Sequence, residues 1–577
     1  MTPSQRELQG QAISNLRVMQ SSDFPIIMLG KANGEELGPC VTIFQPGDLV
    51  IISSCTELAL AQGSVINVTP SGISLRMDKE INCGPSSTYV IDKFEYSSSG
   101  SGNWLNLARL MSDNARSKFI RDHVIAKRPA EFVSGLSKDT ALMAKPILRP
   151  MNLNSVQSKA IFKILMAKNF NLCLGMPGTG KTTLIVALVR LLAKMGKSVL
   201  LTTYTHSALD NVLVKLLKVN DNVPCFLRLG KLSRIHEAIK EHSEDYIIKR
   251  KNLTEIEDLK RLYKSQPVIA TTCLSANNHP AFNDRTFDYC IVDEAGQSLL
   301  LSAIGPLFNA KKFVLLGDPM QLPPVVQSVK ARAMGMDVSL FSHLQTPENT
   351  VALSVQYRMN KEIQDVANHM TYDGQLECGS EEVANRRAKN VEGWPSFLPL
   401  EAKDKSVVFF DTSNLKSMME ATDELGVSNY GEANYVTTLA KFAKKMEIEG
   451  SNPQKATVGI IAPYRAQVSL LRKLLSSTLP SSDISTVDQF QGRDKDIIIY
   501  SCTKTKPLKK VDDKSDDSSN ETSVNILNDW RRLNVAVTRA KAILWIVGNV
   551  QALKSYEPFQ KLSDYLEEKE CIVQLKN

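Results

Sequence analysis

An apolar run, a glycine-rich break and a second apolar run at helical spacing follow one another in "NLCLGMPGTGKTTLIVALVRLL", residues 171–192. The break, "GMPGTGKT", fits the pattern GxxxxGK[ST] from Gly175 to Thr182. Glycines let backbone N–H groups approach phosphate oxygens, Lys181 neutralises the β and γ phosphates, and the Thr182 hydroxyl can hold Mg²⁺. Because the motif stands between a strand and a helix, it predicts a nucleotide site made by Gly175, Pro177, Gly178, Thr179, Gly180, Lys181, Thr182 and Thr183.

Short apolar segments alternate with amphipathic stretches through most of the chain. From about 151 to 345 they are "LCLGM", "SVLLTTYT", "VIATTCLS", "YCIVDEA" and "KFVLLGD". From about 346 to 560 the pattern restarts with "VALSVQYRM", "VVFFD", "TVGIIAPY", "DIIIYSC" and "AILWIVGN". This alternation is typical of a parallel sheet covered on both faces. We therefore expect an α/β protein with two such domains in tandem, 151–345 and 346–560.

The remaining segments carry weaker patterns. Residues 1–37 have little signal, 38–100 read as short strands of a small β-barrel, and 101–150 as a basic helical stalk or linker. In "ISLRM", Ile73, Leu75 and Met77 alternate with polar residues, as a half-buried strand requires. The low-complexity stretch at 506–523 is expected to be a mobile loop, and 561–577 a C-terminal tail.

Composition limits the classes of function. The 577 residues include 69 Lys+Arg and 61 Asp+Glu, which gives a formal charge of +8. This excess favours a polyanionic partner, but a chance excess on a large surface explains it equally well. The sequence contains no run of eighteen apolar residues, so no membrane span is expected. The ten cysteines include no Cys-x-x-Cys spacing, so we expect buried thiols in a reducing, intracellular compartment.

Two further strand ends carry polar side chains suited to hydrolysis. "YCIVDEAGQ" ends on Asp293, which can bind Mg²⁺, and Glu294, which can orient and deprotonate the attacking water. An acidic helix start is the simpler explanation of this pair, but the phosphate loop upstream favours hydrolysis. "VLLGDPMQLPPVV" ends on Asp318 and Gln321, and Gln321 can sense the γ phosphate.

The second half contains arginines and no second phosphate loop. Arg358 in "QYRMN" and Arg539 in "LNVAVTRAKA" both lie close to expected strand boundaries. Guanidinium groups that reach across a domain cleft stabilise charge on a transferring phosphoryl group. Taken singly, each would more often be a surface arginine, so their assignment depends on the other motifs.

The motifs occur in one order along the chain: "LNSVQSKA" with Gln157, "GMPGTGKTT", "TTYTHSALDNVL", "VDEAGQ", "GDPMQLPPV", "QYRMN", "IAPYRAQV", "TVDQFQGRDKDIIIYSC" and "LNVAVTRAKA". This order, over about 150 to 550, resembles superfamily 1 helicases. "GMPGTGKTT", "YTHSALDN" and "DWRRLNVAVTRAK" are together most similar to the helicase region of the eukaryotic DNA replication ATP-dependent helicase/nuclease family, which trims 5′ flaps and resected ends. The resemblance implies two tandem RecA-like P-loop NTPase domains preceded by an accessory β-barrel.

The resemblance also implies roles for individual residues. Gln157 would read adenine and Tyr357 would stack on it, while Lys181, Thr182, Asp293 and Glu294 would form the Mg–phosphate centre. Gln321 would couple the presence of the γ phosphate to neighbouring loops, and Arg358 and Arg539 would contact that phosphate. Gly492 and Arg493 would belong to a segment that couples nucleotide binding to strand binding. Residues of the segments expected to track a single strand are Thr205, Ser207, Asn211, Thr272, Pro463, Tyr464, Thr486 and Gln489.

The family's function follows as an expectation: an ATP- and Mg²⁺-dependent 5′-to-3′ motor on single-stranded or flapped DNA, active in replication and end resection. The resemblance further implies a single-strand-binding protein and replication or repair factors as partners, and the nucleus, with mitochondria as a second site. One departure is that the family's iron–sulfur nuclease domain has no counterpart in the 37 residues before the expected barrel. We therefore expect no iron–sulfur cluster and assign no nuclease activity to these residues.

Two alternatives remain open. A related RNA helicase of the decay or processing type would carry nearly the same motor motifs, because discrimination depends on contacts to the 2′-hydroxyl. A nucleotide-gated clamp or scaffold without unwinding would need no catalytic set, whereas this chain retains Lys181, Asp293, Glu294, Gln321, Arg358 and Arg539.

Overall fold

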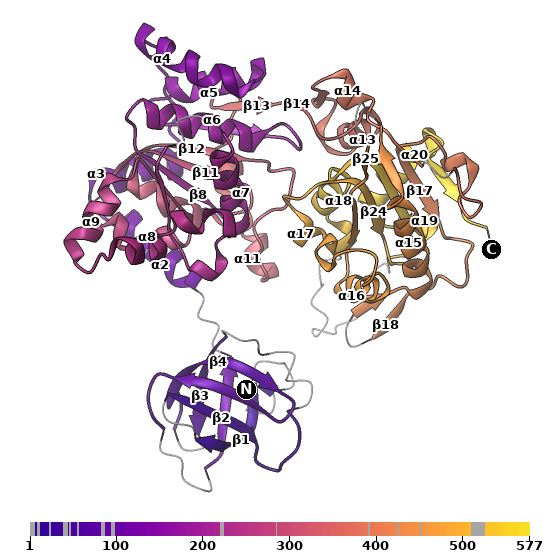
Figure 1. The fold of residues 1–577 in the computed structure, drawn as a ribbon, viewed down its shortest axis with the longest axis horizontal. Coiled ribbons are helices and arrows are strands. Elements are labelled where there is room, and N and C mark those ends of the chain that lie inside the picture. The colour runs from indigo at the N-terminus through magenta and orange to yellow at the C-terminus, as the bar shows by residue number, and fades with distance from the viewer. Residues whose placement is uncertain are drawn as a thin grey trace. The chain divides into compact units, whose positions relative to one another are not determined.

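The computed structural model divides the chain into two compact units, Met1–Ser101 and Gly102–Asn577 (Figure 1). It describes residues 6–7, 12–21, 25–37, 44, 48–54, 57–81, 87–93, 98–219, 224–277, 279–283, 285–390, 393–423, 426–449, 453–508 and 526–576. Most of the loop expected at 506–523 lies outside these residues. None of the described helices is long and apolar enough to cross a membrane.

The first unit is a closed antiparallel barrel. Its strands are β1 (Ala12–Ser21), β2 (Ile26–Lys31), β3 (Leu49–Ser54), β4 (Ala61–Thr69), β5 (Gly72–Met77) and β6 (Tyr89–Lys93), in the order β1-β2-β5-β4-β3-β6. Ile73 and Leu75 are fully buried and Arg76 is exposed, which is the alternation predicted for this strand. β6 pairs back onto β1 and closes the barrel.

The barrel begins at Ala12, so the expected boundary at residue 38 is wrong. β1 and β2 both lie in the segment that carried little signal. The register of β1 shifts between Ile13 and Leu16 and again between Val18 and Gln20. Such irregularities break the two-residue period that identifies a strand in a sequence.

The helices expected to form a stalk at 101–150 pack instead on the first α/β domain. They are α2 (Ser98–Met111), α3 (Ala115–Ile120), the π-helix η2 (Arg121–Ile125) and α4 (Lys138–Leu148). Leu110, Ile120 and Val124 belong to that domain's core, and the Arg116 Nε donates to the Leu307 carbonyl at 3.0 Å. The linker assignment is therefore corrected, because basic residues that suggested an exposed face bond to backbone carbonyls.

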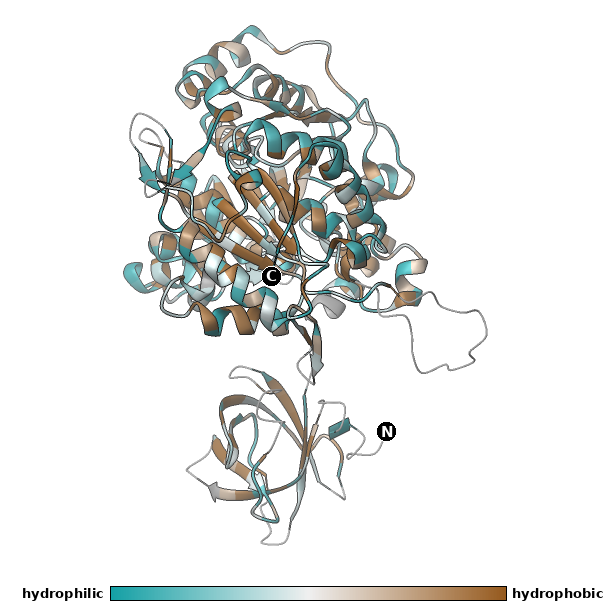
Figure 2. Ribbon diagram, turned by 90° about the vertical axis from the view of Figure 1, so that its right-hand side faces the viewer, coloured by the Kyte–Doolittle hydropathy of each residue, from teal (hydrophilic) through white to brown (hydrophobic). Residues whose placement is uncertain are grey.

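The first α/β domain has a seven-stranded parallel sheet in the order β13-β7-β12-β11-β8-β10-β9. The strands are β7 (Phe170–Gly175), β8 (Val199–Thr203), β9 (Phe226–Arg228), β10 (Val268–Thr272), β11 (Phe287–Asp293), β12 (Ala310–Gly317) and β13 (Thr350–Leu353). Its principal helices are α5 (Ser155–Met166), α6 (Lys181–Lys194), α7 (His206–Leu217), α8 (Glu244–Lys251) and α9 (Ile256–Ser265), with short helices α10 (Leu300–Ile304), α11 (Val329–Ala333) and α12 (Leu340–Leu344). Figure 2 faces the second α/β domain, described next, and shows hydrophobic strands flanked by helices that carry hydrophilic residues.

The second α/β domain has a six-stranded parallel sheet in the order β23-β22-β24-β25-β17-β26. The strands are β17 (Val407–Asp411), β22 (Val458–Ala462), β23 (Ile484–Thr486), β24 (Lys495–Ser501), β25 (Ala540–Gly548) and β26 (Ile572–Gln574). Its helices are α13 (Lys361–Ala367), α14 (Glu381–Ala384), α15 (Tyr430–Ala443), α16 (Arg465–Leu474), α17 (Val487–Phe490), α18 (Trp530–Val537), α19 (Val550–Leu553) and α20 (Glu557–Glu568). The expectation of two tandem parallel sheets is confirmed.

Two boundaries of this domain are corrected. β13 pairs with β7 and extends the first sheet to Leu353, past the expected limit at 345. β26 pairs with β17, so residues 561–577 include the end of α20 and a sheet strand and do not form a free tail. Both strands are short and lie at sheet edges, where only the pairing partner defines them.

Candidate functional site

The phosphate-binding motif folds as a strand, a tight loop and a helix. β7 ends at Gly175, the loop passes through Gly178 and Gly180 with φ angles of 75° and 78°, and α6 begins at Lys181. Positive φ is easily adopted only by glycine. At Gly178 a Cβ would also approach the Arg358 Cβ to 2.7 Å, so a side chain there would push away the segment that carries this arginine.

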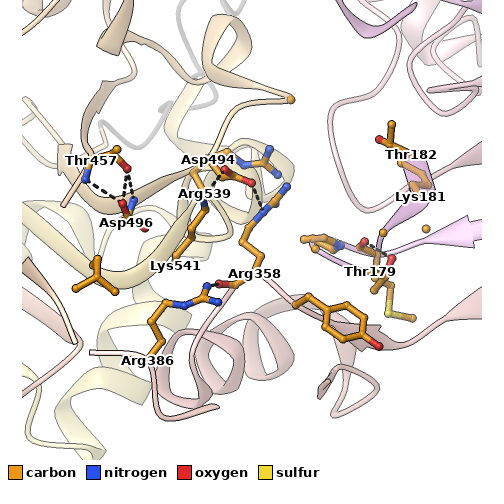
Figure 3. Close-up of a pocket in the computed structure, with 18 of the residues that line it drawn as sticks. Thr179, Lys181, Thr182, Arg358, Arg386, Thr457, Asp494, Asp496, Arg539 and Lys541 are labelled. Carbon is orange, nitrogen blue, oxygen red and sulfur yellow. Dashed lines mark hydrogen bonds and ion pairs between the residues drawn. The ribbon is translucent and has the colours of Figure 1, made fainter. Parts of the chain in front are cut away.

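The loop opens into a cavity of 820 Å³ that both α/β domains line. Figure 3 shows Lys181 and Thr182 on one side of this cavity and Arg358 and Arg539 on the other. The predicted site residues that line it are Gly175, Pro177, Gly178, Thr179, Gly180, Lys181, Thr182, Glu294, Gln321, Tyr357, Arg358, Gly492 and Arg539. Tertiary structure therefore brings together residues that are far apart in the sequence.

Lys181 is paired with the carboxylates that follow β11. Its Nζ donates to the Glu294 Oε1 at 2.9 Å, and the Glu294 backbone N–H donates to the Asp293 Oδ1 at 2.9 Å. Burial by itself lowers the pKa of Lys181, but Glu294 and Asp293 outweigh it and raise that pKa above its ordinary value. The ammonium is thus protonated and available to a phosphate group at neutral pH.

Glu294 is held in a strained backbone conformation. Its φ of 54° lies in the left-handed region, which residues with a side chain rarely adopt. Both carboxylate oxygens are hydrogen-bonded, Oε1 to Lys181 and Oε2 to the Gln297 Nε2 at 2.8 Å. Strain of this kind concentrates at functional sites, and here it aims the carboxylate into the cavity.

Thr182 and Asp293 fit the oxygen ligands that Mg²⁺ prefers. Thr182 lines the cavity, while Asp293 ends the neighbouring strand β11 and is 4% exposed. Burial raises the pKa of Asp293 above its ordinary value, and the charge of Lys181 acts in the opposite direction. A hydroxyl and a carboxylate would bind the ion together with phosphate oxygens and water.

Asp318 and Gln321 form a buried pair at the end of β12. The Gln321 Nε2 donates to the Asp318 Oδ2 at 2.8 Å, and Asp318 is 2% exposed. Burial raises the pKa of Asp318 above its ordinary value. Gln321 reaches the cavity and Asp318 fixes its amide from behind.

The two predicted arginines are oriented from the second domain. The Arg358 Nε donates to the Asp494 Oδ2 at 3.1 Å, and the Arg539 Nε donates to the Val535 carbonyl at 2.9 Å. Burial lowers the pKa of Arg539 to about 9, and the charge of Arg358 acts in the same direction. The negative charge of a phosphate would offset the repulsion between these two guanidinium groups.

Sequence reasoning missed Asp494, which organises these cations. Its carboxylate pairs with Arg358 at 3.1 Å and with Lys541 at 3.0 Å, as Figure 3 shows. Burial raises the pKa of Asp494, but Arg358 and Lys541 outweigh it and the net shift is downward. The only signal in the sequence was its place two residues after Gly492 in "QGRDKD".

Gln157 is not among the residues that line the cavity. Its Nε2 donates to the Thr179 carbonyl at 2.9 Å, and its Oε1 accepts from the Asn154 backbone N–H, which completes a capping box on α5. Its expected contact with adenine stays a prediction. The ring of Tyr357 lines the cavity and is 42% exposed, and the Thr183 hydroxyl accepts from Lys215.

A second groove, also of 820 Å³, lies where the proline-containing loop after β12 meets α18. Tyr204 and Thr205 line it, together with Pro324, Trp530 and Arg532. The Arg531 guanidinium stacks over the Trp530 ring at 4.8 Å. Aromatic faces and cationic groups side by side are the features that bind a single strand without demanding a sequence.

The structure separates the residues predicted to contact nucleic acid. Thr205, Ser207, Asn211 and Gln489 are exposed, whereas Thr272, Pro463 and Thr486 are buried and Tyr464 is partly buried. Thr205 lines the groove and caps α7 through the Ala208 backbone N–H. Arg493 donates to the Ser485 hydroxyl at 3.0 Å and stacks on the Phe490 ring. The strand-contact roles of these residues stay predictions.

Family comparisons agree with this arrangement. Two family models, each described as an AAA domain, match residues 336–551 and residues 152–262 and 249–329. The human "DNA replication ATP-dependent helicase/nuclease DNA2" is 38% identical over 556 residues, which cover 93% of this chain and 50% of that protein. The chain is therefore similar to a DNA replication ATP-dependent helicase/nuclease over 93% of its own length.

Two further DNA replication ATP-dependent helicase/nucleases are similar at lower identity. The Arabidopsis thaliana protein JHS1 is 35% identical and the Saccharomyces cerevisiae DNA2 protein is 34% identical, with 92% and 81% of this chain covered. The matches cover 39% and 29% of those two proteins, so the chain spans half the length of its human relative and less of these. A solved complex of the Arterivirus nonstructural protein 10 helicase with DNA covers 89% of this chain and 76% of that chain, at 13% identity and a TM-score of 0.36.

Proposed function

We propose that this chain is an ATP-dependent motor that moves along single-stranded DNA and unwinds DNA, with roles in replication and repair. The observation that carries the proposal is the cavity in which Lys181, Glu294 and Gln321 of one domain face Arg358 and Arg539 of the other. The similar proteins are DNA replication ATP-dependent helicase/nucleases, which supports DNA as the substrate and the nucleus as the place of action.

The chemistry follows from the side chains at this cavity. Lys181 and the loop N–H groups bind the β and γ phosphates, and Thr182 and Asp293 would hold Mg²⁺. Glu294 accepts a proton from the attacking water, and Arg358 and Arg539 stabilise the charge that develops on the transferring group. Because the arginines belong to the second domain, ATP draws the two domains together and hydrolysis releases them.

Translocation along DNA requires that closure of the two domains change how tightly the protein binds the strand. The groove lined by Tyr204, Thr205 and Trp530 offers stacking faces and donors for phosphate oxygens. Alternate closing and opening of the two domains then moves the strand through the groove in one direction, which family resemblance suggests is 5′ to 3′.

The test is ATP hydrolysis by the full chain with no nucleic acid, with single-stranded DNA and with single-stranded RNA of equal length. We expect DNA to stimulate hydrolysis strongly, and Lys181→Ala to abolish it because the phosphates lose their cation. Lys194→Ala, an exposed lysine on the same helix, is the matched control. Equal or greater stimulation by RNA would favour an RNA helicase, and hydrolysis that does not depend on Lys181 would leave only a clamp.

A further inference from the structure

One buried phenol joins the two α/β domains behind the cavity. Tyr372 ends the π-helix η9 (Asn368–Tyr372), which follows α13 in the second domain, and is 3% exposed. Its hydroxyl donates to the Asp318 Oδ2 of the first domain at 2.7 Å. The same oxygen accepts a hydrogen bond from the Asn534 Nδ2 on α18 at 2.9 Å.

Both hydrogen-bond partners of Tyr372 lead directly to the nucleotide cavity. The Asp318 Oδ2 that accepts from Tyr372 also accepts from the Gln321 Nε2, so one carboxylate oxygen orients both groups. Asn534 lies one helical turn before Thr538, and its carbonyl accepts from the Thr538 hydroxyl at 2.8 Å. Arg539 follows, so a continuous set of contacts connects Gln321 on one wall of the cavity to Arg539 on the other.

The same two elements also form the groove. Leu322, Pro323 and Pro324 follow Gln321 and line it, and Trp530 and Arg531 at the start of α18 line it from the other domain. The Asn534 Nδ2 also donates to the Met320 carbonyl at 2.8 Å, and the Arg531 Nε donates to the Pro319 carbonyl at 3.3 Å. Tyr372 therefore contacts the two elements that separate the cavity from the groove.

The hydroxyl has the chemistry that this position requires. A phenol donates one hydrogen bond and accepts others, so it can link a carboxylate to an amide N–H. Burial and the charge of Asp318 raise the pKa of Tyr372 well above its ordinary value, so the proton that bonds Asp318 is retained. Phenylalanine would fill the same space but would leave the Asp318 Oδ2 and the Asn534 Nδ2 without this bond.

We propose that Tyr372 is a positioning residue that couples the groove to the cavity: its hydroxyl holds the Asp318–Gln321 pair in register with α18 and Arg539. The inference rests on the motor function proposed above. A strand that shifts α18 or the proline segment changes the orientation of Gln321 and Arg539 through this hydroxyl. Coupling, and not nucleotide affinity, is what the hydroxyl controls, because Tyr372 is not among the residues that line the cavity.

The experiment compares Tyr372→Phe with wild type in the full chain, with ATP and a thymidine oligonucleotide as the probes. We expect the KM for ATP to be unchanged and kcat at saturating oligonucleotide to fall about tenfold, the size of effect expected when a hydrogen bond to a charged group is lost. The matched control is Tyr435→Phe, since the Tyr435 hydroxyl is buried in the same domain and has no hydrogen-bond partner within the described ranges. Tyr435→Phe should leave both the KM for ATP and kcat unchanged.

The outcomes separate this inference from the motor itself. Wild type without DNA stimulation would refute the motor and the coupling together. Stimulated wild type with an equally stimulated Tyr372→Phe, or with an equal loss in Tyr435→Phe, would overturn the coupling role alone. If Tyr372→Phe does not fold, Asn534→Leu removes the other donor, and it should lower kcat with the same unchanged KM; a normal kcat there would also overturn the role.

Discussion

Glu294 combines backbone strain, two hydrogen-bonded carboxylate oxygens and a place on the wall of the cavity beside the phosphate-loop motif. At the scale of single residues, such a group can be tested by a change of one atom. Replacing the carboxylate by an amide keeps its shape and one of its two acceptor oxygens but removes the basic group.

Glu294→Gln should therefore lose hydrolysis by a factor of about 100 or more while ATP and single-stranded DNA still bind. Phosphate release measures the first effect, and fluorescence anisotropy of labelled nucleotide and labelled oligonucleotide measures the second. Glu257→Gln, on the exposed face of α9, is the control. Unchanged hydrolysis in Glu294→Gln would remove Glu294 from the role of base.

A second residue predicts how stability depends on pH. Glu432 on α15 is fully buried and accepts from the Ser501 hydroxyl at 2.5 Å and the Thr503 backbone N–H at 2.8 Å. Burial raises the pKa of Glu432 to about 7, against about 4.3 in an unfolded chain. The folded state then binds the proton more tightly, so this group's contribution is complete below pH 4.3 and is lost as pH rises through 7.

Between these pH values the loss amounts to about 3 kcal/mol of the free energy of unfolding. Glu432→Gln cannot ionise, so its stability relative to wild type should increase from pH 4.5 to pH 7.5. Urea unfolding of both proteins at several pH values measures the difference, in which the other titrating groups cancel. A difference that does not vary with pH would contradict the assignment.

At the scale of elements, α7 is attached to the edge strand β9 by a buried ion pair. The Arg228 Nε donates to the Asp210 Oδ1 at 2.8 Å, and the two side chains are 0% and 5% exposed. The Asp210 Oδ2 also accepts from the His236 backbone N–H at 2.9 Å. Since α7 begins just after Thr205, this pair also sets the position of one wall of the groove.

Asp210→Ala should lower the free energy of unfolding by about 3 kcal/mol or more, because the Arg228 charge is left buried without its carboxylate. Chemical unfolding measures the change. Asp258→Ala breaks an ion pair with the exposed Arg261 on α9, and should cost less than about 1 kcal/mol. Equal effects in the two variants would show that the buried pair contributes no more than a surface pair.

At the scale of the whole molecule, the barrel forms one compact unit and the two α/β domains together form the other. Every residue that lines the cavity of 820 Å³ with Lys181 and Arg539 lies between Gly175 and Lys541, within the second unit. The barrel has its own core, in which Leu16, Ile52 and Ile91 are fully buried.

A chain of residues 102–577 should therefore keep ATP hydrolysis in the absence of nucleic acid, with the KM for ATP unchanged. Steady-state kinetics beside the full chain measure this, and Lys181→Ala in the shortened chain controls for contaminating hydrolysis. Loss of the basal rate in a shortened chain that still melts cooperatively would mean that the barrel contributes to the site.

The sequence by itself determined the features that have a local cause. Buried strands such as β11 and β24 read as continuous apolar runs, and the phosphate loop reads as glycines before a lysine, because both depend on neighbouring residues alone. Lys181, Glu294 and Gln321 could be named in this way, Arg358 and Arg539 only from the order of the motifs, and all five line one cavity.

Only the tertiary structure decided the rest. The barrel strand β1 and the edge strands β13 and β26 are defined by pairing with other strands, so their periodicity was too short or too irregular to show the domain limits. Asp494, Tyr372 and Asn534 matter through the groups that they meet across the fold. The spacing of residues in the sequence does not show these contacts, because the hydrogen bonds and ion pairs form between residues that become neighbours only when the chain packs.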